Sequence, residues 1–474
     1  MISVSQKGQV SNCEVYGEGS IVEAVGLIVN EIKKLLLTDA HAREAMVVAC
    51  GKFSLNAKES ALMTITQGLQ EVVTQVCANQ EKGYLGASTA CPKCGAVARF
   101  VRHDKNQIVT LVGTFTIYRS LYQCQNDGCK YSWRPLDEHL DLPQGHYSER
   151  ARRLISLVGG CMPFERASEV LFETTGISIS ATKVRMITEE VGADIGRLIE
   201  DEISAHEAGT LESLPPADVL VVGADGAHLN TREGSWKETK VGSIRRYQRA
   251  ADGTLKLKGS SFTAHLGNVE EFRPKLDVEI ERNGYFGKEA TIFLGDGAHW
   301  IWNMADEISP DSIHVLDYYH LCEHVWETGR ILLGEESAES KRWSRHITED
   351  LLRQEKIDEA INAIRGTCHK TPVSDTDVQA AKDSLVNYIE NNRKRMRYKW
   401  LESHGYPIGS GHVESACKQI VCKRHKQAGM RWSQAGAQQM LNLAAFIHGN
   451  RWDEYWQPKI DRKSTRLNSS HLGI

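Results

Sequence analysis

Two aspartates lie in nearly identical sequence settings, each shortly after an apolar run. Asp225 is in GADGAH after residues 219–222, and Asp296 is in GDGAH after residues 292–294. If both runs are buried strands, both carboxylates lie at strand ends, at the edge of an α/β sheet where ligands bind. A single aspartate of this kind more often caps the helix that follows it. Two of them repel one another unless hard divalent cations neutralise their charge, so the pair predicts a metal site.

Glu414, in the sequence GSGHVES, is the third candidate carboxylate. Alone it would be an ordinary acid in the first turn of a helix, complementing the helix dipole. It is, however, the only acidic residue between Gly411 and Asn450. The residues after it form a basic run that suits a phosphate backbone, with a tryptophan that suits base stacking; the alternative is a solvated basic helix. The predicted DNA-binding residues are Lys418, Lys423, Arg424, Lys426, Arg431 and Trp432.

Four of the twelve cysteines form two tight pairs, Cys91 with Cys94 and Cys124 with Cys129. Two such knuckles on either side of a hairpin supply the four soft ligands that tetrahedral zinc needs. We therefore predict a structural zinc ribbon over residues 86–145, against the alternative of four unrelated reduced thiols. Six further cysteines are scattered singly through apolar or helical sequence, where buried reduced thiols are expected.

Composition sets limits on the class of protein. A chain of 474 residues is too long for one core, so two or three domains are expected. No stretch is long and apolar enough to span a membrane and no signal peptide is evident, so we expect a cytoplasmic protein. The formal net charge of −4 argues against a protein that merely coats nucleic acid. DNA binding then requires the positive charge to be concentrated locally.

The spacing of apolar residues predicts the elements that position these groups. Residues 1–85 show helical spacing, and we expect a helical N-terminal domain that serves packing or oligomerisation. Alternation from Ile108 to Leu121, with a turn at Gly113, predicts strands between the cysteine pairs. Residues 146–200 predict three helices, the first capped by Ser148 and the second ending near Gly176. This helix-turn-helix-like segment either reads DNA or serves packing alone.

The remaining sequence predicts a mixed α/β core. Residues 201–217 are acidic, end in two prolines and predict a linker. Short apolar runs within 218–335, with a helix near 269–282, predict a mixed sheet. We expect 336–403 to form a helical insertion and 404–460 to complete the core with a long final helix that carries Glu414. Residues 461–471 resemble the translation of a common sequencing-library adapter, so we expect 461–474 to be an adapter-derived artefact, disordered.

Taken together, these motifs resemble the DDE transposases of bacterial insertion sequences, specifically the ISKra type. The resemblance rests on GADG at 223–226, LGDGA at 294–298, LDYYHL at 316–321 and GSGHVES at 409–415, and continues through GMRW at 429–432. With the cysteine pairs and RSLY at 119–122, it covers most of residues 90–456.

The resemblance implies a multi-domain α/β protein with an RNase H-like catalytic core. In such a core Asp225 lies on the first strand, Asp296 follows the fourth strand, and Glu414 lies on a late helix. The resemblance also places Asp317 and His320 in a motif that supports the site or positions DNA; a purely structural role for His320 remains an alternative.

The activity that the resemblance implies is metal-dependent cleavage of DNA at insertion-sequence ends and transfer of the cut strand to target DNA. Two Mg²⁺ or Mn²⁺ ions would be held by the three carboxylates. The expected partner is DNA, bound by a homo-oligomer. Two alternatives stay open: an RNase H-like nuclease without strand transfer, and a non-catalytic zinc-ribbon DNA-binding regulator.

Overall fold

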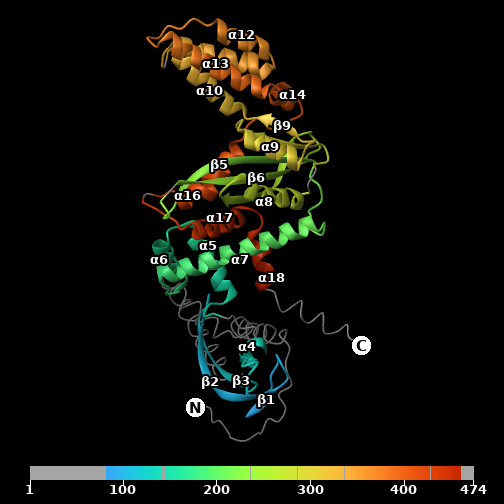
Figure 1. Ribbon diagram of the computed structural model, residues 1–474, viewed down its shortest axis with the longest axis vertical. Helices are drawn as coiled ribbons and strands as arrows, with labels where there is room; N and C mark the ends of the chain where they lie inside the picture. Colours follow the sequence, from blue (N-terminus) through green and yellow to red (C-terminus); the bar gives the residue numbers. More distant parts are fainter. Residues whose placement is uncertain are drawn as a thin grey trace, which may run out of the picture. The chain divides into compact units, whose positions relative to one another are not determined.

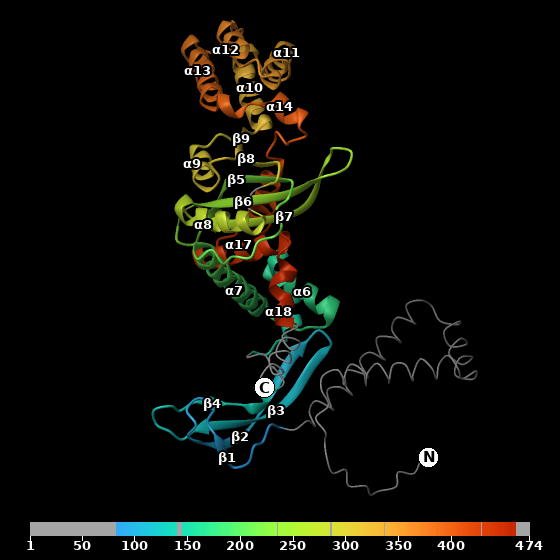
Figure 2. The same ribbon diagram turned by 90° about the vertical axis from the view of Figure 1, so that its right-hand side faces the viewer.

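A computed structural model describes residues 82–139 and 145–460, apart from residues 235, 285–286, 336 and 428. The predicted helical domain over 1–85 lies outside the described residues except for 82–85, which are not helical, and the adapter-like tail over 461–474 lies outside them as well. The chain divides into two compact units: residues 1–107 with 114–136, and residues 108–113 with 137–474. Figures 1 and 2 show the ribbon in two views.

The first unit contains a four-stranded sheet in the order β1-β2-β3-β4. Its strands are β1 (Ser88–Ala90), β2 (Val97–Thr110), β3 (Gly113–Cys124) and β4 (Ser132–Trp133), followed by the short helix α4 (Pro135–His139). The predicted turn at Gly113 is confirmed, since β3 begins there with φ +128°. Most of β2 was not predicted, because charged and polar residues occupy both of its faces and hide the two-residue period.

The second unit begins with α5 (Glu149–Cys161), α6 (Phe164–Thr175) and α7 (Ala181–Glu207). Ser148 caps α5, and Gly176 ends α6 in the left-handed conformation, as the sequence predicted. The predicted linker over 201–217 is wrong in its first part, because α7 continues to Glu207. Its apolar residues Val191, Ile195 and Ile199 pack into the core, and this burial holds the acidic stretch in a helix.

A five-stranded mixed sheet, in the order β7-β6-β5-β8-β9, forms the centre of the second unit. Its strands are β5 (Val219–Asn230), β6 (Trp236–Arg249), β7 (Leu255–Leu266), β8 (Ala290–Gly295) and β9 (Ile313–Leu316). β5, β6 and β7 pair antiparallel, whereas β8 runs parallel to β5 and β9 parallel to β8. The predicted mixed α/β sheet is thus confirmed.

Helices cover both faces of this sheet (Figure 1). On one face, α8 (Val269–Arg282) and α9 (His299–Ile308) bury Leu220, Val222 and Ala224. On the other, α17 (Gln434–His448) packs beneath Ala227 and Leu229, with α7 against it. Gly192 of α7 is required there, because a Cβ would lie 2.1 Å from the carbonyl oxygen of Gln439.

The segment predicted as a helical insertion, 336–403, is mostly helical, with a loop over residues 367–374 between two of its helices. The helix α10 (Tyr318–Leu333) precedes it, and the insertion itself comprises α11 (Ala338–Arg345), η1 (His346–Leu351), η2 (Leu352–Gln354), α12 (Ile357–Gly366), α13 (Asp375–Asn392), η3 (Arg393–Arg395) and α14 (Tyr398–Ser403). Its apolar residues share one core with β8 and β9. The insertion is therefore packed on the sheet edge at β9, and the ribbon shows α10 leading into it from that edge (Figure 2).

The predicted long final helix is wrong in its length. Glu414 lies in α15 (Gly411–Ala416), which continues as the π-helix η4 (Cys417–Cys422) and ends with α16 (Lys423–His425). A loop then leads to α17, and the chain closes with α18 (Trp452–Ile460). In that loop Trp432 forms a β-bridge with Thr231, in place of the backbone hydrogen bonds that a continuous helix would make.

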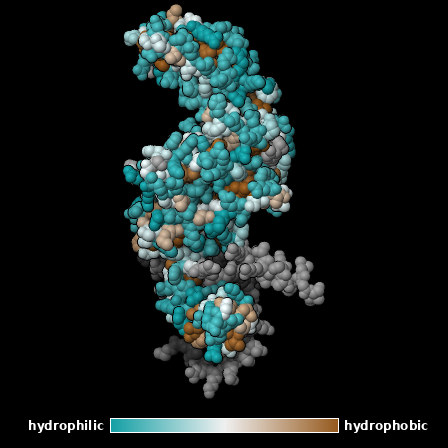
Figure 3. All heavy atoms as spheres, in the orientation of Figure 1, coloured by the Kyte–Doolittle hydropathy of each residue, from teal (hydrophilic) through white to brown (hydrophobic). Residues whose placement is uncertain are grey.

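None of the described helices is long and apolar enough to cross a membrane. The face drawn in Figure 3 is largely hydrophilic over the described elements, with apolar side chains scattered among polar ones.

Candidate active site

Asp225 and Asp296 lie side by side across two parallel strands. β5 pairs with β8 from Val219↔Ala290 to Gly223↔Leu294. Two residues further along each chain, the same register reaches Asp225 and Asp296. The sequence predicted that both aspartates would follow a strand, and this holds for Asp296 alone. Asp225 lies within β5, because that strand continues beyond the end of β8 through its pairing with β6.

Asp317 extends the same row to a third strand. β8 pairs with β9 through Gly295↔Leu316, so Asp296 and Asp317 are the next residues on their two chains. The backbone amide of Asp317 also donates to the carbonyl of Gly295 at 2.8 Å. Three aspartates therefore lie at one edge of the sheet, where the parallel strands β8 and β9 end and β5 runs past them.

The backbone around Asp296 is tightly held. Its Oδ1 accepts a hydrogen bond from the amide of Ala298 at 2.9 Å, and its carbonyl accepts one from the hydroxyl of Tyr388 at 2.6 Å. Gly297 has φ +104°, and a Cβ there would lie 2.9 Å from the ring of Tyr388. The helical insertion, through Tyr388 of α13, thus fixes the turn that carries Asp296.

Asp317 holds the loop before Glu414 against the sheet. Its Oδ1 caps α10 by accepting from the amides of Tyr319 at 2.7 Å and His320 at 3.3 Å. Its Oδ2 accepts from the amide of Ser410 at 3.1 Å and from the Ser410 hydroxyl. Asp317 is nearly fully buried. These four hydrogen bonds make it a positioning residue, whose carboxylate is engaged by the protein itself.

The helix that carries Glu414 lies directly on β5. A Cβ at Gly223 would lie 2.1 Å from Cγ2 of Val413 and 3.1 Å from Nε2 of His412. Only glycine permits this approach, which brings α15 over the strand two residues before Asp225. The exposed side chain of Glu414 then completes the edge of the site.

The predicted carboxylates all line one cavity of about 310 Å³. Asp225, Asp296 and Glu414 line it together with Asp317 and His320, which the sequence had named as supporting residues. Tyr319, Glu323 and Ser410 also line it and were not predicted. Among the described residues that form this cavity, five are acidic and none is lysine or arginine. The cavity therefore carries negative charge that no lysine or arginine in its lining offsets.

Burial raises the pKa of Asp225, and the negative charge of Asp296 raises it further. The amide of Gly226, at 2.6 Å from Oδ1, and the thiol of Cys417, at 3.5 Å from Oδ2, oppose this increase. Cys417 opens the π-helix η4, a type of irregularity that is frequent at functional sites. A cation beside Asp225 and Asp296 would relieve the repulsion between them.

The predicted DNA-binding run separates into exposed and buried members. Lys418, Lys423, Lys426 and Arg431 are exposed, as a contact with phosphates requires. Lys418 lies one helical turn beyond Glu414.

Arg424 and Trp432 are buried, and their predicted direct contact with DNA does not fit this placement. The guanidinium of Arg424 lies 4.5 Å from the ring centroid of Phe164 and 4.9 Å from that of Trp432. Its Nε donates to the carbonyl of Gly159 at 3.1 Å. We assign both residues to packing between the loop after α16 and helices α5 and α6.

The hairpin between β5 and β6 adds an exposed aromatic residue that sequence reasoning missed. Trp236 is 63% exposed at the start of β6. In the same hairpin, Arg232 donates from its amide to the carbonyl of Trp432 at 2.8 Å and from Nε to the carbonyl of Arg431 at 3.2 Å. These bonds place the hairpin tip beside the basic loop. The available signal was a tryptophan next to Lys237 and four residues after Arg232.

Four cysteines of the first unit cluster as predicted, and the cluster can hold a metal ion such as zinc. The sulfur atoms of Cys91, Cys94, Cys124 and Cys129 all lie within 4.8 Å of one another. The Cys94–Cys124 and Cys91–Cys129 sulfur distances are 3.5 and 4.0 Å, near the roughly 3.8 Å expected between sulfurs around tetrahedral zinc. Over the described part of the chain, this is the one group of three or more possible ligands with such close spacing. The cavity carboxylates lie further apart.

A model of an uncharacterised protein family, UPF0236, matches residues 97–459. No curated protein matches the chain. Among solved structures, a similar chain is that of the crystal structure of NurA bound to dAMP and manganese, at 16% identity and a TM-score of 0.09. The similarity covers 60% of this chain and 64% of that chain, so less than two thirds of the NurA chain is spanned.

Proposed function

The chain belongs to the uncharacterised protein family UPF0236, and we propose that this member is a DDE transposase with an RNase H-like catalytic core. One observation carries the proposal. Three carboxylates from separate segments, Asp225, Asp296 and Glu414, line a single cavity that has no lysine or arginine in its described lining. Asp225 on the first strand of the sheet, Asp296 after the fourth and Glu414 on a late helix also agree with the arrangement that the resemblance implies.

The donor set fits hard divalent cations. Carboxylate oxygens favour Mg²⁺ or Mn²⁺ over zinc, and the repulsion that raises the pKa of Asp225 is relieved when a cation binds. Asp225, Asp296 and Glu414 would hold two such ions. When bound, these ions supply a lowered pKa for the attacking hydroxyl and charge stabilisation for the leaving oxygen.

The protein's own groups orient this site. The amides of Gly226 and Ala298 each occupy one oxygen of an aspartate and set the direction of the other. Asp317 fixes the loop before Glu414. The exposed Lys418, one helical turn beyond Glu414, provides positive charge for the DNA backbone near the acidic cavity.

For the cysteine cluster we propose structural zinc in a zinc ribbon. With all four positions taken by protein thiolates, the metal would stabilise the first unit and would have no open position for catalysis.

The decisive experiment measures nicking and strand joining by the full chain on duplex DNA taken from the flanks of its coding region, with Mg²⁺ or Mn²⁺. We expect Asp225→Asn, Asp296→Asn and Glu414→Gln each to reduce cleavage by more than the roughly 100-fold typical for loss of an outer-shell partner. DNA binding should be retained in all three. Glu270→Gln, an exposed acid in the first turn of α8, is the matched control.

Full cleavage by either aspartate variant would refute the assignment. A supplied 3′-hydroxyl end distinguishes the alternatives: nicking without joining indicates a nuclease, and metal-independent binding without nicking indicates a regulator.

A further inference from the structure

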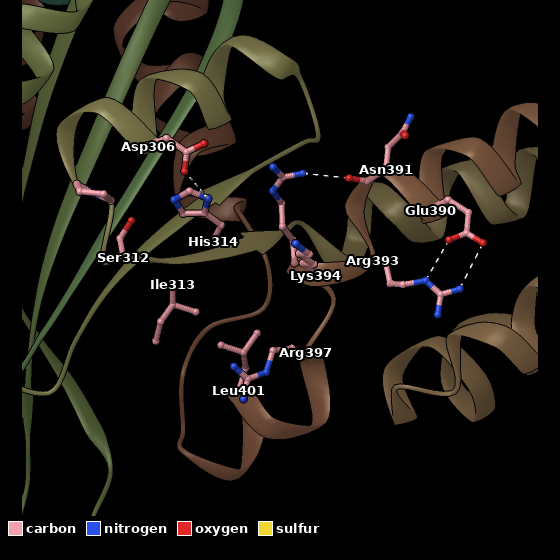
Figure 4. Close-up of a pocket in the computed structure, with 12 residues that line it drawn as sticks. Asp306, Ser312, Ile313, His314, Glu390, Asn391, Arg393, Lys394, Arg397 and Leu401 are labelled. Carbon is pink, nitrogen blue, oxygen red and sulfur yellow. Dashed lines mark hydrogen bonds and ion pairs between the residues drawn. The ribbon is translucent and has the colours of Figure 1, made fainter.

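A second cavity, of about 710 Å³, lies at the other end of β9 and has the opposite charge (Figure 4). Ile313 and His314 of β9 line one side of it, and the segment 390–397 of the insertion lines another. Four basic residues lie among its lining, Arg393, Lys394, Arg395 and Arg397, against two acidic ones, Asp306 and Glu390.

The two acids leave most of this positive charge unneutralised. Glu390 pairs with Arg393 at 3.0 Å, and Arg393 also pairs with Asp358 at 2.6 Å. Asp306 lies 3.8 Å from Nδ1 of His314. In the described part of the chain, no carboxylate forms an ion pair with Lys394, Arg395 or Arg397.

Aromatic rings hold two of these cations in place. The guanidinium of Arg395 lies 4.5 Å from the ring centroid of Trp302, and that of Arg397 lies 4.2 Å from the ring of Trp400. Arg395 donates to the carbonyl of Asn391 at 3.2 Å and to Oδ1 of Asn392 at 3.1 Å. Burial lowers the pKa of Arg395, and the negative charge of Asp306 opposes this decrease. An arginine that is stacked and oriented but forms no ion pair with a carboxylate is suited to binding a phosphate.

We propose that this cavity binds the sugar-phosphate backbone of the DNA on which the acidic cavity acts. The inference rests on the proposed function for the identity of the DNA. β9 joins the two cavities, since Ile313 lines one and Asp317, directly after the strand, lines the other. Four residues of strand span about 13 Å, which is the axial length of about four base pairs. A single duplex can therefore contact both cavities.

The carboxylates of the acidic cavity repel phosphates, so a positive site at the other end of β9 would help to hold the backbone near it. The volume also favours a polymer, because about 710 Å³ is much larger than one phosphate ion needs. An acidic protein segment is the competing occupant.

The test measures duplex DNA binding by the full chain without divalent ions, as a function of salt. The variant is Lys394→Ala with Arg397→Ala, two exposed residues of the cavity. The control is Lys356→Ala with Lys399→Ala, two exposed lysines of the same insertion outside the lining. Loss of two phosphate contacts should reduce the slope of log affinity against log salt by about 1.8 and weaken binding of all sequences alike.

Two outcomes would overturn this inference. One is a variant that keeps the native salt slope, as an acidic protein partner would predict. The other is a variant that inorganic phosphate or a mononucleotide no longer stabilises against unfolding, although the variant keeps its affinity for duplex DNA. Cleavage is scored separately: altered DNA binding without any cleavage by the native chain would refute the proposed function and leave this site standing.

Discussion

Asp225, within β5, and Asp296, directly after the neighbouring strand β8, lie at the same register, because the two strands pair in parallel up to Gly223 and Leu294, two residues before each aspartate. This relationship explains why the sequence around Asp225, GADGAH, is so similar to the sequence around Asp296, GDGAH. Each must deliver one carboxylate to the same edge of the sheet while leaving space for what packs over it.

Gly223→Ala should displace α15 and reduce metal-dependent cleavage. The new Cβ would lie 2.1 Å from Cγ2 of Val413, and overpacking of this kind costs about 1–3 kcal/mol. Adding Val413→Ala should restore part of both stability and cleavage, since it removes the clashing methyl group. In Gly411→Ala a Cβ meets nothing within 4 Å, so its free energy of unfolding should be unchanged or higher. Equal loss of stability in both glycine variants would contradict the proposed close approach.

Asp317→Ala should lower stability and the affinity for Mg²⁺ or Mn²⁺ together. It removes the cap of α10, worth about 1 kcal/mol, and it leaves the amide of Ser410 without its acceptor. Ser374→Ala removes the cap of α13 alone and lies outside the cavity lining. Calorimetric titration with Mn²⁺ should show about 10–100-fold weaker binding for Asp317→Ala and native binding for Ser374→Ala. If both variants bind Mn²⁺ with native affinity, Asp317 has no positioning role at the metal site.

Removing zinc should destabilise the first unit. Chelation or Cys94→Ser should lower its unfolding temperature, by about 4–8 °C for each kcal/mol lost, because four protein ligands tie β1 through β4 together. Cys368→Ser changes an exposed cysteine outside the cluster and is the matched control. An unfolding temperature that neither the chelator nor Cys94→Ser changes would show that the four thiols bind no structural metal.

Acid should weaken the packing around the loop after α16. Burial, together with the charge of Arg424, lowers the pKa of His425 from its usual 6.5 to about 4. Between these values the unfolded chain binds a proton that the folded chain does not, so stability falls as the pH falls from 6.5 to 4. The loss attributable to His425 is up to about 3 kcal/mol.

His425→Leu should flatten that part of the stability profile, measured by urea unfolding at a series of pH values. His346→Leu, at an exposed position, should leave the profile as it is in the native chain. A native slope in the His425→Leu variant would mean that other groups cause the acid sensitivity.

The sequence by itself determined the local elements and the residues with chemical potential. Caps at Ser148 and Gly176, the apolar runs of β8 and β9, and the four cysteine positions act over a few neighbouring residues, so their patterns were sufficient. The two GDG-like settings identified Asp225 and Asp296 for the same reason. Local patterns were insufficient for β2 and the end of α7, where polar residues are held in a strand or helix by the rest of the unit.

Only the tertiary structure decided which of these residues meet. The register of β5, β8 and β9 aligns three aspartates that lie far apart in the chain, and the glycine at 223 allows Glu414 to join them. Packing also separated the buried Arg424 from the exposed Lys418, although both lie in one basic run. Burial and strand register depend on contacts between distant segments, which the order of residues along the chain does not display.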